Sequence, residues 1–514
     1  MDDKICGYYL DNQQKKIVLD NSNHLLVVAG AGSGKTLTIL GKINYLIKYK
    51  NISPDEILCI SFTRASADSL KKKIIKEFSI DMPVYTFHKL SLEILKEDIN
   101  KYEVADSNTL DNIIHNFLHI DILNYPLYMK KVLEYYKIKV RNNLKSTYIK
   151  FCNNKEMVLL EKLLSTFIKL FKCNNHSLED FNKFLKKARK TCFYRKYKRE
   201  KIFLTLALNI YLLYQEYLRE NNEIDFDDMI INATKFVSNH GIKTKYKYII
   251  IDEYQDTSYI RFLLVKSILD STKSKLMVVG DDFQSIYRFT GCDLTLFLNF
   301  STYFNDSNIL KIENTYRNSQ ELISVAGNFV MKNRSQIRKN LKSNKILDKP
   351  IEILFYKDIK KTFIYLIEQI HKKTYKPIMI LGRNNDDINI LLGEDFTLDS
   401  SGNLTYLKNK DICMYYLTAH KSKGLEEENV IIINLENKLL GFPNKIKDDK
   451  VLRFVTNSFD KYPYNEERRL FYVAITRTKN KVYLLVPKDK YSVFVEELLT
   501  NYLSKIKVWK SLAL

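Results

Sequence analysis

Short apolar runs recur along the first 280 residues of the chain, and a polar or glycine-containing turn follows each of them. Longer stretches with helical spacing of apolar residues lie between the runs. Short apolar runs bounded by turns are typical of buried strands, and their alternation with helices favours a parallel sheet covered on both faces. The predicted strands are Leu25–Val28, Ile57–Phe62, Tyr248–Ile251 and Leu276–Val279.

Two further patterns complete the predicted α/β fold. Residues from about 95 to 209 contain no glycine and carry apolar residues at helical spacing, which predicts an all-helical insert. A second set of strand-like runs lies near Ile351–Phe355, Pro377–Leu381, Ile412–Leu417, Val430–Ile433 and Lys481–Val486. We therefore expect a first α/β domain at residues 1–95 and 210–304, the helical insert at 96–209, and a second α/β domain with a parallel sheet at 305–514.

The chain is strongly basic. Its 514 residues carry a formal net charge of +22 and give a pI of about 9.3, which favours a polyanionic partner such as nucleic acid. AT-rich coding bias, which raises Lys, Asn, Ile and Tyr together, is the alternative source of much of the lysine. Ten Lys or Arg residues, interleaved with aromatic residues, lie between Lys183 and Lys201. They suit either a nucleic-acid contact surface or a solvated helix face.

The sequence favours a cytoplasmic protein with no membrane partner. The acidic start, Met1-Asp2-Asp3-Lys4, is unlike a signal peptide, and no apolar run approaches the ~20 residues that span a bilayer. The seven cysteines are scattered without CxxC spacing, so no cysteine-based zinc or iron–sulfur site is indicated.

The strongest chemical signal follows the first predicted strand. Glycines there let backbone N–H groups turn toward a phosphate, and the helix that follows adds the positive end of its dipole. In such a loop Lys35 can reach the β- and γ-phosphates and the Thr36 hydroxyl can ligate Mg²⁺. The loop therefore predicts a site for a nucleoside triphosphate and Mg²⁺. Its residues are Ala29, Gly30, Ala31, Gly32, Ser33, Gly34, Lys35 and Thr36.

A second nucleotide signature, Asp252-Glu253-Tyr254-Gln255-Asp256, follows the third predicted strand. A carboxylate at the end of a buried strand can hold Mg²⁺, which suits Asp252, and the neighbouring Glu253 can polarise the attacking water. A plain acidic turn is the alternative interpretation.

Two arginines could bring further positive charge to a γ-phosphate, as phosphoryl transfer requires. They are Arg317 in Asn314-Thr315-Tyr316-Arg317-Asn318 and Arg477 in Ala474-Ile475-Thr476-Arg477. If both belong to the second domain, ATP would lie in the cleft between the domains. From the residues alone, a surface or structural role for each arginine is the simpler interpretation.

In their order along the chain, these segments resemble the motif set of superfamily 1 DNA helicases of the UvrD/Rep/PcrA type. The resemblance extends from residue 10 to residue 477, which is nearly the whole chain. In detail, Tyr287–Gly291 and the tail from Gly441 resemble helicase IV most. The matching segments are Leu10–Gln14, Ser61–Arg64, Thr86–His88, Asp252–Asp256, Gly280–Phe289, Tyr316–Arg317, His420–Glu426 and Glu466–Arg477.

The resemblance implies two RecA-like domains with ATP and Mg²⁺ between them. Gln14 would then read the adenine, Tyr316 would stack on it, and Glu426 would contact the ribose. Thr36 and Asp252 would hold the metal. The catalytic set implied by the family is Lys35, Asp252, Glu253, Gln255, Arg317 and Arg477.

The resemblance also implies a track for single-stranded DNA across both domains. A base can stack on Phe62 or Phe289, although core packing is the alternative for each ring. A capping or core role is the alternative for His88, and Gln284 would couple the track to the γ-phosphate. The predicted DNA contacts are Phe62, Thr63, Thr86, His88, Tyr287, Phe289 and His420.

The implied function is an ATP-dependent 3′-to-5′ translocase or helicase acting on single-stranded DNA and single/double-strand junctions, in repair, recombination or replication. Residues 384–417 are too few for the second large insert of bigger relatives, so we expect a compact form with a vestigial insert site there. Two alternatives stay open. One is a remodelling factor acting on a protein–nucleic acid complex such as RNA polymerase. The other is the motor of an anti-phage or phage system, with a nuclease as partner.

Overall fold

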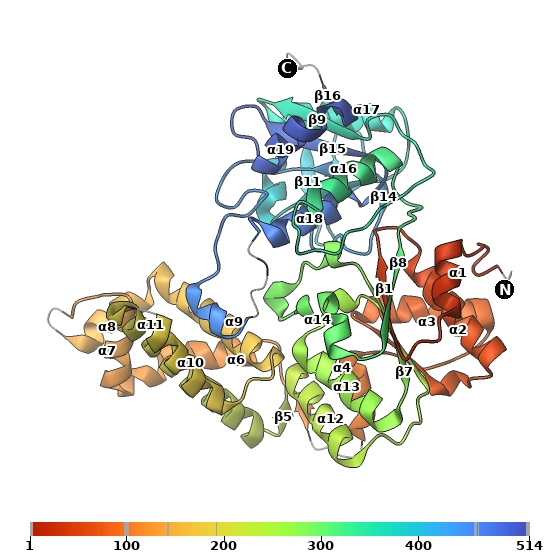
Figure 1. The fold of residues 1–514 in the computed structure, drawn as a ribbon. Helices are drawn as coiled ribbons and strands as arrows, with labels where there is room; N and C mark the ends of the chain where they lie inside the picture. The colour runs from red at the N-terminus through yellow and green to blue at the C-terminus, as the bar shows by residue number, and fades with distance from the viewer. Residues whose placement is uncertain are drawn as a thin grey trace.

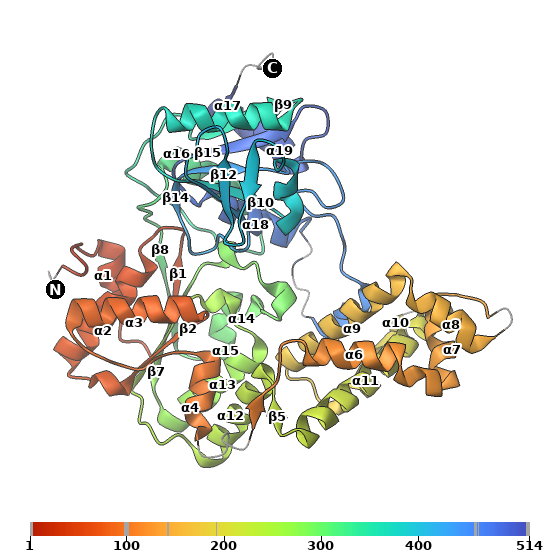
Figure 2. The same cartoon turned by 180° about the vertical axis from the view of Figure 1, so that it is seen from behind.

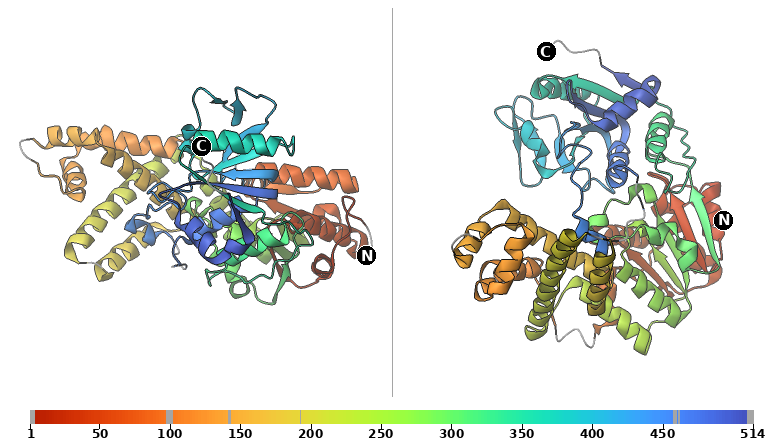
Figure 3. Two further views of the ribbon diagram at one scale, coloured as in Figure 1. Left: turned by 90° about the horizontal axis from the view of Figure 1, so that it is seen from above. Right: turned by 60° about the vertical axis from the view of Figure 1, so that its left-hand side comes forward.

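The computed structural model describes residues 4–96, 102–140, 143–191, 193–456, 460 and 462–509. Two α/β domains lie one above the other, and a helical arm projects to one side of the lower domain (Figure 1). Seen from behind and from above, the arm stands clear of both sheets (Figures 2 and 3). In this described part of the chain, no helix has the length and apolar character that a bilayer span requires.

The first domain contains a six-stranded, all-parallel sheet in the order β3-β2-β6-β7-β1-β8. The four strands predicted from the apolar runs are present. The predicted domain boundary at residue 304 is too early, because β8 lies beyond it and pairs with β1 along its whole length. The strands are β1 (His24–Ala29), β2 (Ile57–Ser61), β3 (Val84–Thr86), β6 (Tyr248–Ile251), β7 (Lys275–Gly280) and β8 (Ser307–Ile312).

Helices cover both faces of this sheet because successive strand residues point to opposite sides. Leu25 and Val27 of β1 pack in one core with α1, α2 and α3, whereas Leu26 and Val28 pack in another with α4, α12 and α13. These helices are α1 (Asn12–Leu19), α2 (Lys35–Lys50), α3 (Arg64–Phe78), α4 (Phe87–Ile94), α12 (Phe226–His240) and α13 (Tyr259–Thr272).

The second domain contains an eight-stranded sheet in the order β11-β12-β13-β10-β14-β15-β9-β16. The five predicted strands form its parallel centre, and a hairpin adds two antiparallel strands at one edge. That hairpin lies in residues 384–417. The strands are β9 (Ile351–Tyr356), β10 (Ile378–Gly382), β11 (Phe396–Leu398), β12 (Asn403–Tyr406), β13 (Met414–Thr418), β14 (Glu427–Ile432), β15 (Thr478–Pro487) and β16 (Ile506–Val508).

Helices again pack on this second sheet. Their apolar residues share two cores with the strands. The helices are α16 (Gln320–Val330), α17 (Ile359–His371), α18 (Asn465–Ile475) and α19 (Val493–Tyr502).

The arm is all-helical apart from a short parallel pair at its base, β4 (Glu103–Val104) with β5 (Glu223–Ile224). Its last helix continues through the predicted insert boundary at residue 209, so that boundary is also too early. The arm helices are α6 (Thr109–His119), α7 (Pro126–Tyr135), α8 (Leu144–Cys152), α9 (Lys155–Cys173), α10 (Leu178–Thr191) and α11 (Tyr194–Glu220).

A segment from the second half of the chain completes the core of the arm. The short helix η7 (Lys450–Phe454) lies beside α9 (Figure 1) and buries Val451, Leu452 and Phe454 among the arm helices. Arg453 forms a two-pronged ion pair with Glu200 of α11, at 2.6 and 2.7 Å. The arm is therefore held to both halves of the chain.

Candidate functional site

The phosphate loop lies between β1 and α2, as the sequence predicts. Gly32 and Gly34 adopt φ values of +69° and +80°, which favour glycine. A Cβ on Gly32 would lie 2.4 Å from the Cβ of Arg317, and one on Gly34 would lie 2.6 Å from Nε2 of Gln14. The hydroxyl of Ser33 is buried without a hydrogen-bond partner among the described residues. The loop thus brings bare backbone and an unpaired hydroxyl to one place, as a phosphate cradle requires.

The acidic segment after β6 lies against this loop. The ammonium of Lys35 lies 2.6 Å from Oε1 of Glu253, whose other oxygen accepts a 2.6 Å hydrogen bond from Nε2 of Gln255. Burial alone would raise the pKa of Glu253, but Lys35 and Lys423 outweigh it and hold that pKa low. Burial and the neighbouring Glu253 raise the pKa of Asp252. Two acids of opposite tendency therefore face the same lysine.

Side chains from the second half of the chain close the site. A cavity of about 890 Å³ is bordered by the phosphate loop, the acidic pair and three residues predicted from sequence, Arg317, Glu426 and Arg477. Arg317 Nε donates to Glu426 Oε2 at 2.6 Å. Arg477 is buried and donates to Oε1 of Gln284 at 3.3 Å. Burial and Arg317 lower the pKa of Arg477 to about 9. The structure thus brings both arginines to the cavity that contains Lys35 and Glu253.

The residues predicted to hold adenine also lie together. Gln14 is buried in α1 and donates from Nε2 to the carbonyl of Ser33 at 3.1 Å. Asp11 caps α1, and its Oδ2 accepts a 2.6 Å hydrogen bond from the hydroxyl of Tyr316. Tyr316 is 59% exposed and borders the cavity. An exposed ring beside a fixed amide suits recognition of a planar base.

Two lysines at the site were not predicted from sequence. Lys423 forms an ion pair with Asp256 and donates to the carbonyl of Gln284 at 2.8 Å, so it links the second domain to the acidic segment. Lys339 is fully buried between the carboxylates of Asp281 and Asp282. Lysine is so frequent in this chain that its spacing gave no signal for either position.

Four predicted DNA contacts form one cluster between the domains. The rings of Phe62 and Tyr287 stack with centroids 6.1 Å apart and planes at 8°. The hydroxyl of Tyr287 donates to the carbonyl of His420 at 3.2 Å, and the ring of Phe289 lies edge-on to His420 with centroids 5.7 Å apart. Phe289 is 57% exposed, so its ring is free of the core. The cluster combines an exposed ring with a stack that joins two segments.

A cavity of about 1300 Å³ lies next to this cluster. Phe289 and Arg288 border it from the first domain, and Arg383, His420 and Lys421 border it from the second. Burial and Arg383 lower the pKa of His420 to about 4, so its ring is neutral at pH 7. Apolar and basic groups from both domains therefore border one large cavity.

The other three predicted DNA contacts lie elsewhere. Thr63 caps α3 and borders the 890 Å³ cavity with the phosphate loop. Thr86 caps α4, and His88 packs on the ring of Phe226 with centroids 4.8 Å apart. None of the three borders the 1300 Å³ cavity. Their role as DNA contacts stays a prediction.

The basic segment of the arm contains both packed and exposed aromatic rings. Phe184 is buried in the arm core, whereas Phe193 and Tyr194 are 92% and 76% exposed. The solvated-face interpretation therefore holds for the α10 side. The two exposed rings lie where α11 begins.

Comparisons with known proteins agree with this geometry. A family model described as the UvrD/REP helicase N-terminal domain matches residues 10–305, and one described as the UvrD-like helicase C-terminal domain matches residues 392–489. The chain is 25% identical over 493 residues to DNA helicase IV of Escherichia coli (strain K12), covering 95% of this chain and 69% of that relative.

Two further relatives show how coverage varies. The chain is 27% identical over 523 residues to ATP-dependent DNA helicase Rep of Buchnera aphidicola subsp. Schizaphis graminum, covering 95% of this chain and 72% of that relative. It is 27% identical over 401 residues to ATP-dependent DNA helicase PcrA of Bacillus subtilis, covering 73% of this chain and 49% of that relative. The chain thus spans about half to seven-tenths of the length of these relatives.

Proposed function

The chain belongs to the UvrD/REP helicase family, and we propose that it is an ATP-driven motor that moves 3′ to 5′ along single-stranded DNA. One observation carries the proposal. Arg317 and Arg477 from the second half of the chain border the same cavity as Lys35 and Glu253 from the first. A triphosphate bound there would touch both halves, so its hydrolysis would change the contact between them.

The ion pair between Lys35 and Glu253 suggests how the site responds to ATP. The β- and γ-phosphates would compete for the Lys35 ammonium, and this competition would release Glu253 to polarise a water molecule. Thr36 and Asp252 would hold Mg²⁺, which neutralises phosphate charge when bound. Gln255 keeps contact with Glu253 and with the backbone N–H of Asp281, so it would report the state of the phosphate to the next segment.

The DNA track would pass the cavity beside Phe289 and His420. A base stacked on an aromatic ring contributes about 1–3 kcal/mol to binding whatever its identity, which suits a motor that must accept every sequence. Arg383 and Lys421 would face the phosphate backbone from the second domain. We place the activity in the cytoplasm, on single-stranded DNA and junctions formed in repair, recombination or replication.

Steady-state ATPase assays test the motor proposal. We expect single-stranded DNA to stimulate turnover strongly, and duplex DNA or RNA to stimulate it less. Raising the salt concentration should weaken the stimulation, with a slope of roughly −0.7 per phosphate contact in a log–log plot. An ATPase rate that no nucleic acid changes would instead favour a factor acting on a protein.

Streptavidin displacement tests the polarity. A 3′-to-5′ motor should remove streptavidin faster from the biotinylated 5′ end of an oligonucleotide than from its 3′ end. A variant with Lys35 changed to Ala should displace neither. Faster removal from the 3′ end would refute the proposed direction.

A further inference from the structure

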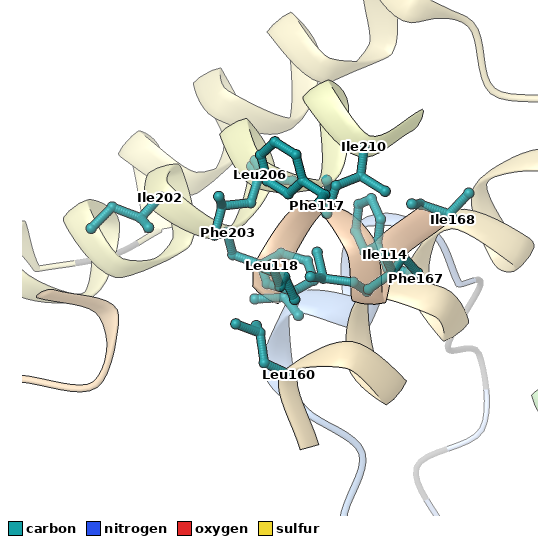
Figure 4. Packing of buried hydrophobic residues seen from close by; sticks show 14 of the residues in the cluster. Ile114, Phe117, Leu118, Leu160, Phe167, Ile168, Ile202, Phe203, Leu206 and Ile210 are labelled. Carbon is teal, nitrogen blue, oxygen red and sulfur yellow. The ribbon is translucent and has the colours of Figure 1, made fainter. Parts of the chain in front are cut away.

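A group of metal-binding side chains lies in the arm, far from both cavities described above. His115 and His119 are four residues apart on α6, so they share one face of the helix. Each directly follows a core residue, Ile114 or Leu118, which points into the arm (Figure 4). The imidazoles therefore lie at the outer edge of the contact between α6 and α9. Glu161 of α9 follows Leu160, another residue of this core.

The three side chains converge on one point. Nδ1 of His115 and Nε2 of His119 lie 3.1 and 2.7 Å from the same oxygen, Oε1 of Glu161. The two rings stack with centroids 4.1 Å apart and planes at 24°, so their nitrogens face the same side. All three ligand atoms lie within 4.8 Å of one another, and no other such group occurs among the described residues.

We propose that His115, His119 and Glu161 bind one divalent transition-metal ion of the Zn²⁺ class, which fastens α6 to α9. Two imidazole nitrogens and a carboxylate are a ligand set that Zn²⁺ favours, whereas Mg²⁺ and Ca²⁺ favour oxygen ligands alone. Zn–N distances of about 2.0–2.1 Å place ligand atoms about 3.4 Å apart in a tetrahedron. The ligands need to move outward by only a few tenths of an ångström. Water would complete the shell, because the His115 side chain is 57% exposed.

The ligand spacing explains why the sequence did not reveal this site. Glu161 follows His119 by 42 residues, and the fold brings them together through the packing of α6 on α9. Cysteine spacing, which excluded a cysteine-based zinc site, does not bear on a site of this kind. Cys152 of α8 is not part of the group, since its thiol lies 4.0 Å from the carbonyl of Leu118.

Calorimetric titration of the full chain with ZnCl₂, without nucleotide, tests the proposal. We expect one tight site that weakens at least tenfold in His119→Ala and in Glu161→Gln, a loss of about 1.4 kcal/mol per factor of ten. His240→Ala, which removes an exposed histidine of the first domain, should bind Zn²⁺ like the unchanged chain. Equal isotherms for the unchanged chain and His119→Ala would overturn the proposal, and so would displacement of Zn²⁺ by equimolar Mg²⁺.

Two further measurements identify the ligands and the effect. Co²⁺ should give visible d–d bands that disappear in His115→Ala, without a sulfur-to-metal charge-transfer band, because Cys152 is not a ligand. Hydrogen exchange of the α6 amides should slow when Zn²⁺ is added to the unchanged chain and should not respond in Glu161→Gln. A charge-transfer band, or exchange that ignores Zn²⁺ in every variant, would contradict the assigned site. None of these outcomes depends on the motor proposal.

Discussion

Replacing Lys339 by Met tests whether a buried ion pair holds the two domains in register. The Lys339 side chain has no solvent exposure, and neither have those of Asp281 and Asp282. Its ammonium lies 2.6 Å from Oδ1 of Asp282, and 3.7 Å from the centroid of the Phe283 ring. Methionine fills a similar volume but leaves two carboxylates buried without this cation.

The expected loss follows from that burial. Removing one partner of a buried ion pair costs about 3–5 kcal/mol, a large part of the ~5–15 kcal/mol that stabilises a typical domain. Burial raises the pKa of Asp282 even with Lys339 present. A carboxyl whose pKa is raised on folding favours the native state when protonated. The defect of Lys339→Met should therefore be small below pH ~4 and grow as the pH rises toward the raised pKa of Asp282.

Urea unfolding followed by circular dichroism measures the effect. Lys71→Met is the matched control, because Lys71 and Asp81 form an exposed ion pair of 2.8 Å, which contributes about 0–1 kcal/mol. Adding Asp282→Asn to Lys339→Met should restore part of the lost stability. If Lys339→Met and Lys71→Met lower the stability equally at pH 8, the reasoning is refuted.

Three further substitutions test the two cavities. Glu253→Gln should bind ATP normally and lower kcat by about 10²–10⁴, measured by equilibrium binding and steady-state turnover, and turnover like the unchanged chain would exclude Glu253 as the base. Gly32→Ala should lower ATP affinity at least tenfold in a binding titration, because its Cβ would lie 2.4 Å from that of Arg317 at a φ of +69°; unchanged affinity would contradict a close-fitting cradle. Phe289→Ala should weaken binding to a fluorescent oligonucleotide by about 1–3 kcal/mol and leave the DNA-free ATPase rate unchanged, and equal DNA affinity would argue against stacking.

Local patterns predicted the parts of the fold that local forces determine. β1 reads as a strand because Leu25 to Val28 are apolar and buried on both faces. The phosphate loop is recognisable because its glycines occupy backbone conformations that other residues disfavour. β8 gave no such signal, since it lies at the sheet edge and Ile312 is its one fully buried residue. The first domain boundary was therefore placed too early.

Long-range contacts escaped prediction for a different reason. The arm core includes Phe454, which packs beside Phe184 although 270 residues separate them. Nothing near Phe454 in the sequence distinguishes this partner from any other apolar surface. Similarly, the burial of Lys339 depends on two aspartates about 58 residues away. Motif order indicated which residues form the nucleotide site, but charge pairs across it had to come from the structure.

The segment that follows β7 joins the two cavities, and its contacts suggest how they communicate. Gln284 accepts from Arg477 beside the nucleotide cavity, and three residues later Tyr287 donates to the carbonyl of His420 beside the DNA cavity. Both partners belong to the second domain, so any rotation of that domain must disturb both contacts together. Lys339 anchors the beginning of the same segment through Asp281. If this anchor keeps the segment rigid, Lys339→Met should reduce the stimulation of ATPase by DNA more than it reduces the DNA-free rate.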